Sequence, residues 1–202
     1  MLVVNNELIE KINAHVEEAY PEEGAGFLIG NEGEVNMGVA YDSPPIVYKD
    51  TLVVGANTGE APSSGDPGNT RAFDAKTGKP IPSFGTNGEV DLTAGLSRAI
   101  RKEHYTNTSP PLVWGNLVIL GNGVGDRLQY KGDPPGDIQA FDVKTGKRVW
   151  RFKTVPEAGE YGNDTWKDDS WKYVGHTNAW APLSADDARG IIYVPVGTPS
   201  ND

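Results

Sequence analysis

The residues that most often bind zinc or carry out thiol chemistry are few in this sequence. The 202 residues contain no cysteine and three histidines, His15, His104 and His176, which are far apart and form no His-x-His pair. A catalytic zinc ion needs three suitable ligands brought together, and a disulfide needs two cysteines. The sequence therefore excludes disulfides and thiolate metal sites and indicates no zinc site. His104, in the charged run Arg-Lys-Glu-His, is expected to be exposed.

Aromatic side chains gather near a charged run in the last third of the chain. The run 167–169, Lys-Asp-Asp, is followed by Trp171 and then by Trp180. Such a run is typical of an exposed loop. Its closeness to the two tryptophans indicates that it could also form the rim of a pocket.

Four further residues have ordinary structural explanations when they are considered one by one. Asp126 lies in a glycine-rich stretch, where an aspartate commonly forms a turn. Thr198 belongs to a Gly-Thr-Pro turn, which needs no metal ion. Thr108 precedes a Ser-Pro-Pro segment, where its hydroxyl can bond to the backbone, and Trp180 can pack in a core. Any binding role for these residues depends on the elements that position them.

The composition favours short strands joined by tight turns over a bundle of helices. Hydrophobic residues make up 37% of the chain, and there are 25 glycines and 15 prolines. The formal net charge of −10 argues against nucleic acid or an anionic membrane surface as a partner. No apolar run approaches the roughly 20 residues of a membrane span, and the first residues show no secretory signal.

Most of the chain repeats itself. A Ser-Pro-Pro segment with a short apolar run occurs at 43–48 and again at 109–114, 66 residues later. A strand with an Asp-x-x-Thr-Gly turn occurs at 70–79 and at 138–147, 68 residues later. A third copy covers about 178–197. In each turn the aspartate can cap backbone N–H groups, and glycine supplies the positive φ that closes a hairpin.

Each repeat predicts a unit of four strands, which is the pattern of a propeller blade. We therefore expect a mainly β fold, a partial β-propeller of two to three blades with a short N-terminal helix. A blade buries its faces only against neighbouring blades, so a short run of blades leaves open edges. Self-association through these edges is expected.

The stretch 136–150 resembles the tryptophan-docking motif of pyrroloquinoline-quinone (PQQ) dehydrogenases. The resemblance implies that Ala140, Gly146 and Trp150 lock one blade to the next, with the indole on a neighbouring peptide plane. The earlier copy has Pro82 in place of the tryptophan.

Residues 160–182 look most like the glucose-dehydrogenase-like and related sugar or alcohol branch of this family, and the resemblance covers 38–202. It implies an eight-bladed propeller and hydride transfer from a sugar or alcohol to PQQ activated by Ca²⁺ or Mg²⁺. It also implies a quinone or cytochrome as electron acceptor and a periplasmic location.

The resemblance assigns site residues one by one. Trp180 matches the aromatic floor beneath the cofactor, and Thr108 matches a hydroxyl at its rim. Asp126 and Thr198 match metal ligands, and oxygen ligands suit Ca²⁺ or Mg²⁺. The general base of the family belongs to a segment expected beyond Asp202, so no catalytic residue is assigned, and the chain alone is expected to be inactive. The alternative is a non-catalytic propeller module that serves as a scaffold or binding surface.

The N-terminal region has a different pattern. Residues 8–19 have the apolar spacing of an amphipathic helix that ends before Pro21, and 24–30 can form a short strand. This helix and strand are similar to the opening of the JAMM (MPN) zinc metalloproteases, in which Glu23 would match the acid/base residue. The absence of a His-x-His pair disfavours that activity. We therefore expect a boundary between 1–37 and 38–202.

Overall fold

The computed structural model describes residues 43–56, 59–60, 63–64, 68–124 and 130–200. The predicted N-terminal helix, Glu23 and Asp126 lie outside these ranges.

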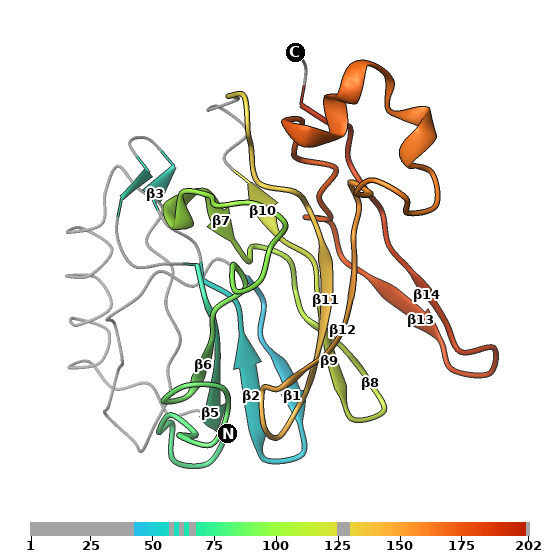
Figure 1. Ribbon diagram of the computed structural model, residues 1–202. Helices are drawn as coiled ribbons and strands as arrows, with labels where there is room; N and C mark the ends of the chain where they lie inside the picture. Colours follow the sequence, from blue (N-terminus) through green and yellow to red (C-terminus); the bar gives the residue numbers. More distant parts are fainter. Residues whose placement is uncertain (1–42, 57–58, 61–62, 65–67, 125–129, 201–202) are drawn as a thin grey trace.

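Two antiparallel sheets of four strands form the body of the protein (Figure 1). The first sheet, here the first unit, has the strand order β1-β2-β5-β6, with β1 at Ile46–Tyr48, β2 at Thr51–Val54, β5 at Thr70–Asp74 and β6 at Glu89–Val90. The second unit has the order β8-β9-β11-β12, with β8 at Leu112–Trp114, β9 at Leu117–Leu120, β11 at Ile138–Asp142 and β12 at Arg148–Phe152. The third unit is a hairpin of β13 at Ser184–Asp186 and β14 at Ile191–Tyr193.

The smaller elements lie in the connections. They are β3 at Gly59–Glu60, β4 at Ser63–Ser64, β7 at Tyr105–Thr106, β10 at Gly123–Val124 and three 3-10 helices, η1 at Lys102–His104, η2 at Asn163–Thr165 and η3 at Lys167–Lys172. Within the described ranges, no helix has the length and apolar character needed to cross a membrane.

The units follow one another as blades of a propeller do. The first strands of successive units are in contact, β1 with β8 and β8 with β13. The predicted mainly β fold, a partial propeller of two to three blades, is confirmed. The strands also lie at the positions that the sequence repeat predicts. In each of the first two units, the apolar run after Ser-Pro-Pro forms the first strand, and the stretch that ends at the Asp-x-x-Thr-Gly turn forms the third.

Strand β9 shows how a blade buries both of its faces. Successive side chains of a strand point to opposite faces. Val118 and Leu120 therefore pack with the first unit, in a core that includes Val53 and Ala72. Ile119 points the other way, into a second core with Ala179 and Leu183 of the segment that leads into the third unit. This continuous apolar run, buried on both faces, is typical of a strand between two layers.

The Asp-x-x-Thr-Gly turns have nearly identical geometry in the first two units. Asp142 Oδ1 accepts hydrogen bonds from the backbone N–H groups of Lys144 and Thr145, at 3.1 and 2.9 Å, and from the Thr145 hydroxyl at 2.8 Å. Asp74 does the same in the first unit. The third unit has a related turn, in which Asp186 accepts from the N–H of Arg189 at 3.0 Å.

The docking residues lie at contacts between units, as the resemblance implied. The N–H of Gly85, in the first unit, donates to the carbonyl of Thr145 at 2.8 Å. A Cβ on Gly146 would lie 2.5 Å from the Gly85 nitrogen, so only glycine fits there. On the opposite face of the sheet, Ala140 is fully buried, and Trp150 packs against the core shared with the third unit.

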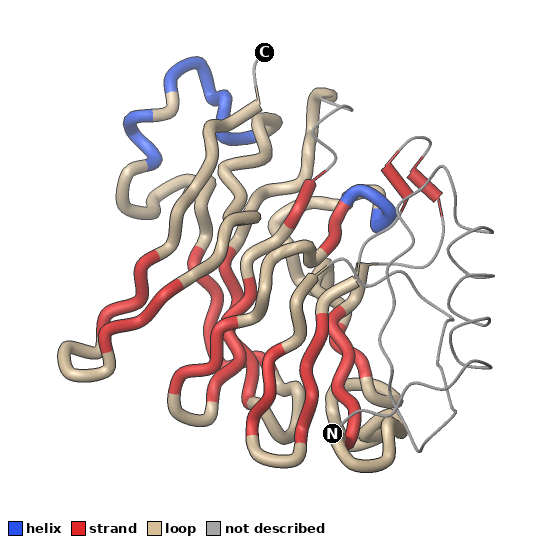
Figure 2. Tube along the Cα trace, turned by 180° about the vertical axis from the view of Figure 1, so that it is seen from behind, coloured by secondary structure: helices blue, strands red, loops and turns tan. Residues whose placement is uncertain are grey.

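The two ends of the units differ in character. At one end, the turn end, lie the short β1–β2, β8–β9 and β13–β14 turns together with the turns at 74–79 and 142–148 (Figure 2). At the opposite end, the loop end, lie the long connection that carries η2 and η3 and the chain after β14 (Figures 1 and 2).

Candidate functional site

Trp180 projects from a rigid segment with its indole exposed. The residue before it, Ala179, is fully buried, and its carbonyl accepts hydrogen bonds from the N–H of Asn122 at 2.9 Å and the hydroxyl of Ser109 at 3.0 Å. The Trp180 side chain itself is 62% exposed. Its ordinary explanation as a core residue is therefore wrong for this structure, and an exposed indole on fixed backbone is available to a flat ligand.

Thr108 and Trp180 occupy equivalent places on neighbouring units. A Cβ on Gly55 would lie 2.2 Å from the carbonyl oxygen of Asn107, and one on Gly121 would lie 2.0 Å from that of Ala179. The segment that contains Asn107 therefore crosses the first unit in the same register in which the segment that contains Ala179 crosses the second. Thr108 and Trp180 are the next residues along these segments.

A second pair of glycines gives the same register. A Cβ on Gly68 would lie 2.4 Å from Cα of Thr106, and one on Gly136 would lie 2.3 Å from Cα of Asn178. Thr108 follows two residues after Thr106, and Trp180 two residues after Asn178. The Thr108 side chain is partly buried, and its Oγ1 would lie 3.1 Å from a Cβ on Gly123.

Thr198 lies beside the segment that leads to Trp180. The carbonyl of Thr198 accepts a hydrogen bond from the N–H of Thr177 at 3.3 Å, and the N–H of Gly197 donates to the carbonyl of Asn178 at 2.9 Å. The Thr198 residue is exposed. The structure thus places Trp180 and Thr198 on adjacent segments, while Asp126 lies outside the described residues.

The candidate site offers an aromatic ring and oxygen atoms, which are the groups that PQQ and a hard cation need. The exposed indole suits the flat ring, and the side chains of Thr108 and Thr198 offer hydroxyl oxygens. Asn122, whose N–H donates to the carbonyl of Ala179, has its Oδ1 buried without a hydrogen-bond partner among the described residues. The residues present therefore fit the cofactor in kind. In the part of the chain that the structure describes, no group of three or more His, Cys, Asp or Glu side chains could hold a metal ion.

Buried polar side chains gather at the loop end, and the sequence patterns did not indicate them. This buried layer consists of Tyr105, Asp137, His104, Asp133 and His176. The carboxylate of Asp137 is buried, with Oδ2 3.4 Å from Nε of Arg151. Burial raises the pKa of Asp137, and the charge of Arg151 partly opposes this effect. Burial likewise raises the pKa of Tyr105, with a contribution from the Asp137 charge.

His104 belongs to this buried layer, and the expectation that it is exposed is wrong. Its side chain is 4% exposed and meets the ring of Tyr130 edge-on, at a centroid distance of 5.5 Å. The charged run around it misled the prediction because the short helix η1 turns only His104 inward. The run 167–169 is exposed, as predicted, and forms part of η3.

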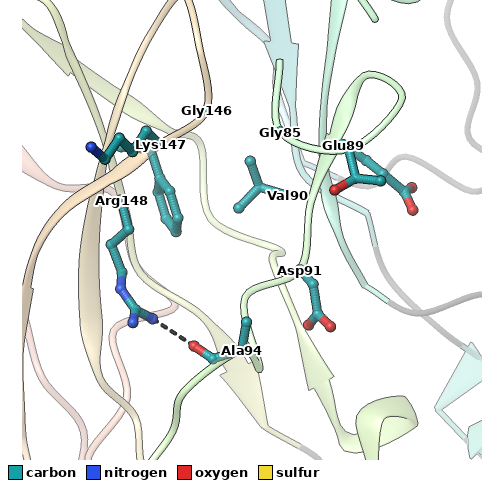
Figure 3. A pocket seen from close by; sticks show the side chains of 10 residues that line it. Gly85, Glu89, Val90, Asp91, Ala94, Gly146, Lys147 and Arg148 are labelled. Carbon is teal, nitrogen blue, oxygen red and sulfur yellow. Dashed lines mark hydrogen bonds between the residues drawn. The ribbon is translucent and has the colours of Figure 1, made fainter. Parts of the chain in front are cut away.

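A groove of about 430 Å³ separates the first and second units (Figure 3). It is lined on one side by residues such as Glu89 and Asp91 and on the other by Lys147 and Arg148. The Arg148 guanidinium crosses the seam and donates to the carbonyl of Ala94 at 2.6 Å. Among the predicted site residues that the structure describes, Thr108, Trp180 and Thr198 do not line this groove, so it is a different place from the candidate site.

Similar proteins include quinoprotein and quinohemoprotein dehydrogenases. Residues 72–202 match the PQQ family described as glucose/ethanol/alcohol dehydrogenase, beta-propeller domain. The quinoprotein glucose dehydrogenase A of Acinetobacter calcoaceticus is 38% identical over 63% of this chain and 16% of its own length. The quinohemoprotein alcohol dehydrogenase of Pseudomonas putida is 31% identical over 82% of this chain and 20% of its own length.

The solved structures agree with the sequence matches. The structure of a Pseudomonas putida quinohemoprotein alcohol dehydrogenase superposes with a TM-score of 0.55 at 28% identity, over 77% of this chain and 21% of that protein. This chain spans about a fifth or less of the length of the relatives named here. These comparisons do not support the similarity of residues 1–37 to zinc metalloproteases. By its sequence match and its fold, the chain belongs to the glucose/ethanol/alcohol dehydrogenase β-propeller family of PQQ proteins.

Proposed function

We propose that this chain forms part of the cofactor site of a PQQ-dependent dehydrogenase that oxidises a sugar or an alcohol. The observation that carries the proposal is the exposed indole of Trp180, 62% accessible on a backbone whose preceding residue is fully buried. Thr198 on the adjacent segment and Thr108 at the equivalent place of the neighbouring unit complete the set of described residues.

In this proposal each residue has one task. Trp180 supplies the floor on which the flat ring lies, and Thr108 supplies a hydroxyl at the rim. Thr198 and Asp126 supply oxygen ligands for Ca²⁺ or Mg²⁺. A bound PQQ would supply a quinone able to accept hydride, and a bound metal ion would supply a positive charge beside it. The chain's own residues bind and orient the ring, and we assign none of them as the general base.

We infer the substrate, the electron acceptor and the location from the similar proteins. One relative is named for glucose and another for alcohol, so we propose a sugar or alcohol as substrate. The name quinohemoprotein supports passage of electrons to a cytochrome, with a quinone as the other candidate acceptor. We propose a periplasmic location on the same family grounds. We also propose that residues 38–202 form the propeller domain and residues 1–37 a separate segment.

The third unit offers an open face through which we propose that the chain self-associates. Ile119 of the second unit is fully buried because the third unit covers that face. At the matching place of the third unit, Tyr193 is 53% exposed and Ile191 is 42% exposed. Replacing both with lysine should leave a monomer in analytical ultracentrifugation. An unchanged mass distribution relative to the parent chain would show that this face is not used.

A non-catalytic propeller module is the second candidate. In such a module the same blades serve only as a scaffold or a binding surface. Such a module would not respond to Ca²⁺ or Mg²⁺ when it meets PQQ. Dependence of binding on the metal ion therefore separates the two candidates.

The test is a titration with PQQ in Ca²⁺ or Mg²⁺, followed by the quenching of tryptophan fluorescence. We expect saturable, metal-dependent quenching, and binding about tenfold weaker in Trp180→Ala, since an aromatic contact contributes ~0.5–1.5 kcal/mol beyond its buried area. Trp171→Ala is the matched control and should bind normally. Equal affinity of Trp180→Ala and the parent chain would refute the assignment of the floor.

A further inference from the structure

Asp133 is a buried carboxylate behind the candidate site, and none of the roles proposed above uses it. Its side chain is fully buried. Oδ1 accepts a hydrogen bond from the N–H of Tyr130 at 2.7 Å. Oδ2 lies 3.4 Å from Nε2 of His176 and has no hydrogen-bond partner among the described residues. Since burying a carboxylate costs several kcal/mol unless it is paired, packing alone does not explain this residue.

His176 begins the backbone from which Trp180 projects, and that backbone is strained. His176 and Thr177 both have positive φ, 60° and 49°, although neither is glycine. Each such residue costs roughly 1–2 kcal/mol, and it persists only when its surroundings hold it. The N–H of His176 donates to the carbonyl of Pro134 at 2.9 Å, so the segment containing Asp133 also holds it through the backbone.

Arg98 ties the same two segments together from the connection that follows the first unit. Its guanidinium donates to the carbonyls of Asp133 at 3.3 Å, Val174 at 3.2 Å and Trp171 at 2.8 Å. Asp133 therefore lies where the turn 130–133 and the segment before Trp180 converge. The imidazole of His176 is the side chain through which its carboxylate reaches that second segment.

We propose that Asp133 is a positioning residue that, through His176, holds the strained backbone at 176–177 and so fixes the exposed indole of Trp180. The inference rests on the proposed function, in which that indole is the floor of the PQQ site. The carboxylate touches neither cofactor nor substrate. Asp133 affects PQQ binding only by fixing the orientation of the segment 176–180.

Asp133→Asn in the full chain tests the proposal, because it removes the charge facing His176 while an amide oxygen can still accept from Tyr130. Amide hydrogen exchange should become faster in peptides covering 174–180 and stay unchanged in those covering β2 and β5. PQQ in Ca²⁺ should bind about tenfold more weakly, as is typical when a supporting residue behind a ligand site is lost. Asp74→Asn, in an exposed turn of the first unit, is the matched control and should change neither the exchange at 174–180 nor the PQQ affinity.

The two readouts separate this inference from the proposed function. Unchanged exchange at 174–180 would overturn the positioning role, whether or not PQQ binds. Faster exchange along the whole chain would also overturn it, because the variant would then be generally destabilised. Local acceleration at 174–180 in a protein whose parent chain binds no PQQ would support the positioning role and refute the proposed function.

Discussion

The turn end and the loop end of this protein are built from the same strands, yet they satisfy their polar groups in different ways. At the turn end, Asp74 and Asp142 accept the same three hydrogen bonds in successive units. At the loop end, Asp133 and Asp137 are buried, and within the described part of the chain oxygen atoms of both lack hydrogen-bond partners. Two pairs of successive non-glycine residues there have positive φ, Asp168–Asp169 and His176–Thr177, whereas Lys49 in the β1–β2 turn is a single such residue.

This difference indicates that the turn end is structural and that the loop end forms the binding site. Such a turn can be used again in each unit, because its aspartate accepts hydrogen bonds from N–H and hydroxyl groups of the turn itself. Buried carboxylates and strained backbone are costly and are commonly concentrated where a protein binds or reacts. The exposed Trp180 and Thr198 belong to the loop end, which agrees with a binding site there.

The largest effect should come from filling the close contact beneath Ala179. A Cβ in Gly121→Ala would lie 2.0 Å from the Ala179 carbonyl oxygen, so the backbone that carries Trp180 must shift. We expect a loss of about 3 kcal/mol in the free energy of unfolding and a loss of PQQ binding. Urea denaturation and the PQQ titration measure the two effects.

Gly115→Ala, in the β8–β9 turn, is the control at the turn end. Gly115 has a φ of 61°, and nothing lies within 4 Å of its Cβ position. Its substitution should cost about 1 kcal/mol through backbone conformation alone and leave PQQ affinity unchanged. Equal losses of stability and of binding in both variants would remove the distinction between the two ends.

A smaller effect is expected when a turn loses its aspartate. Asp142→Ala removes the acceptor for Lys144, Thr145 and the threonine hydroxyl. Because the turn is solvated, we expect a loss of about 1 kcal/mol in unfolding free energy and no change in PQQ affinity. Weaker cofactor binding in this variant would show that the turn end also shapes the site.

The two ends should also respond to pH with opposite signs. Hydrogen bonds, first from the Thr145 hydroxyl, lower the pKa of Asp142, so its contribution to stability is present above the ordinary value of 3.8 and is lost as pH falls through the lowered pKa. Burial raises the pKa of Asp137, so stability is lost there as pH rises from 3.8 through the raised pKa.

Urea midpoints of the parent chain, Asp142→Asn and Asp137→Asn between about pH 3 and pH 7 measure both slopes. Asp142→Asn should be less stable than the parent chain near pH 7, and this difference in stability should become smaller towards about pH 3. The stability of Asp137→Asn relative to the parent chain should increase as pH rises. Slopes of the same sign for both variants would contradict the contrast in their surroundings.

The repeated part of the fold could be predicted from sequence because its signals are local. The apolar runs and the Asp-x-x-Thr-Gly turns predicted the strands of both units. The buried layer at the loop end could not be predicted in this way, since its members meet only after long loops fold together. Asp133 and His176 are 43 positions apart in a region without period, and the charged neighbours of His104 pointed towards solvent.

The most direct test of the central claim, that the loop end carries the cofactor, is a crystal structure of the full chain with PQQ and Ca²⁺. We expect the PQQ ring to stack on the indole of Trp180, with the metal ion within reach of the Thr198 oxygen atoms. PQQ bound instead in the groove lined by Glu89 and Arg148 between the first two units would contradict it.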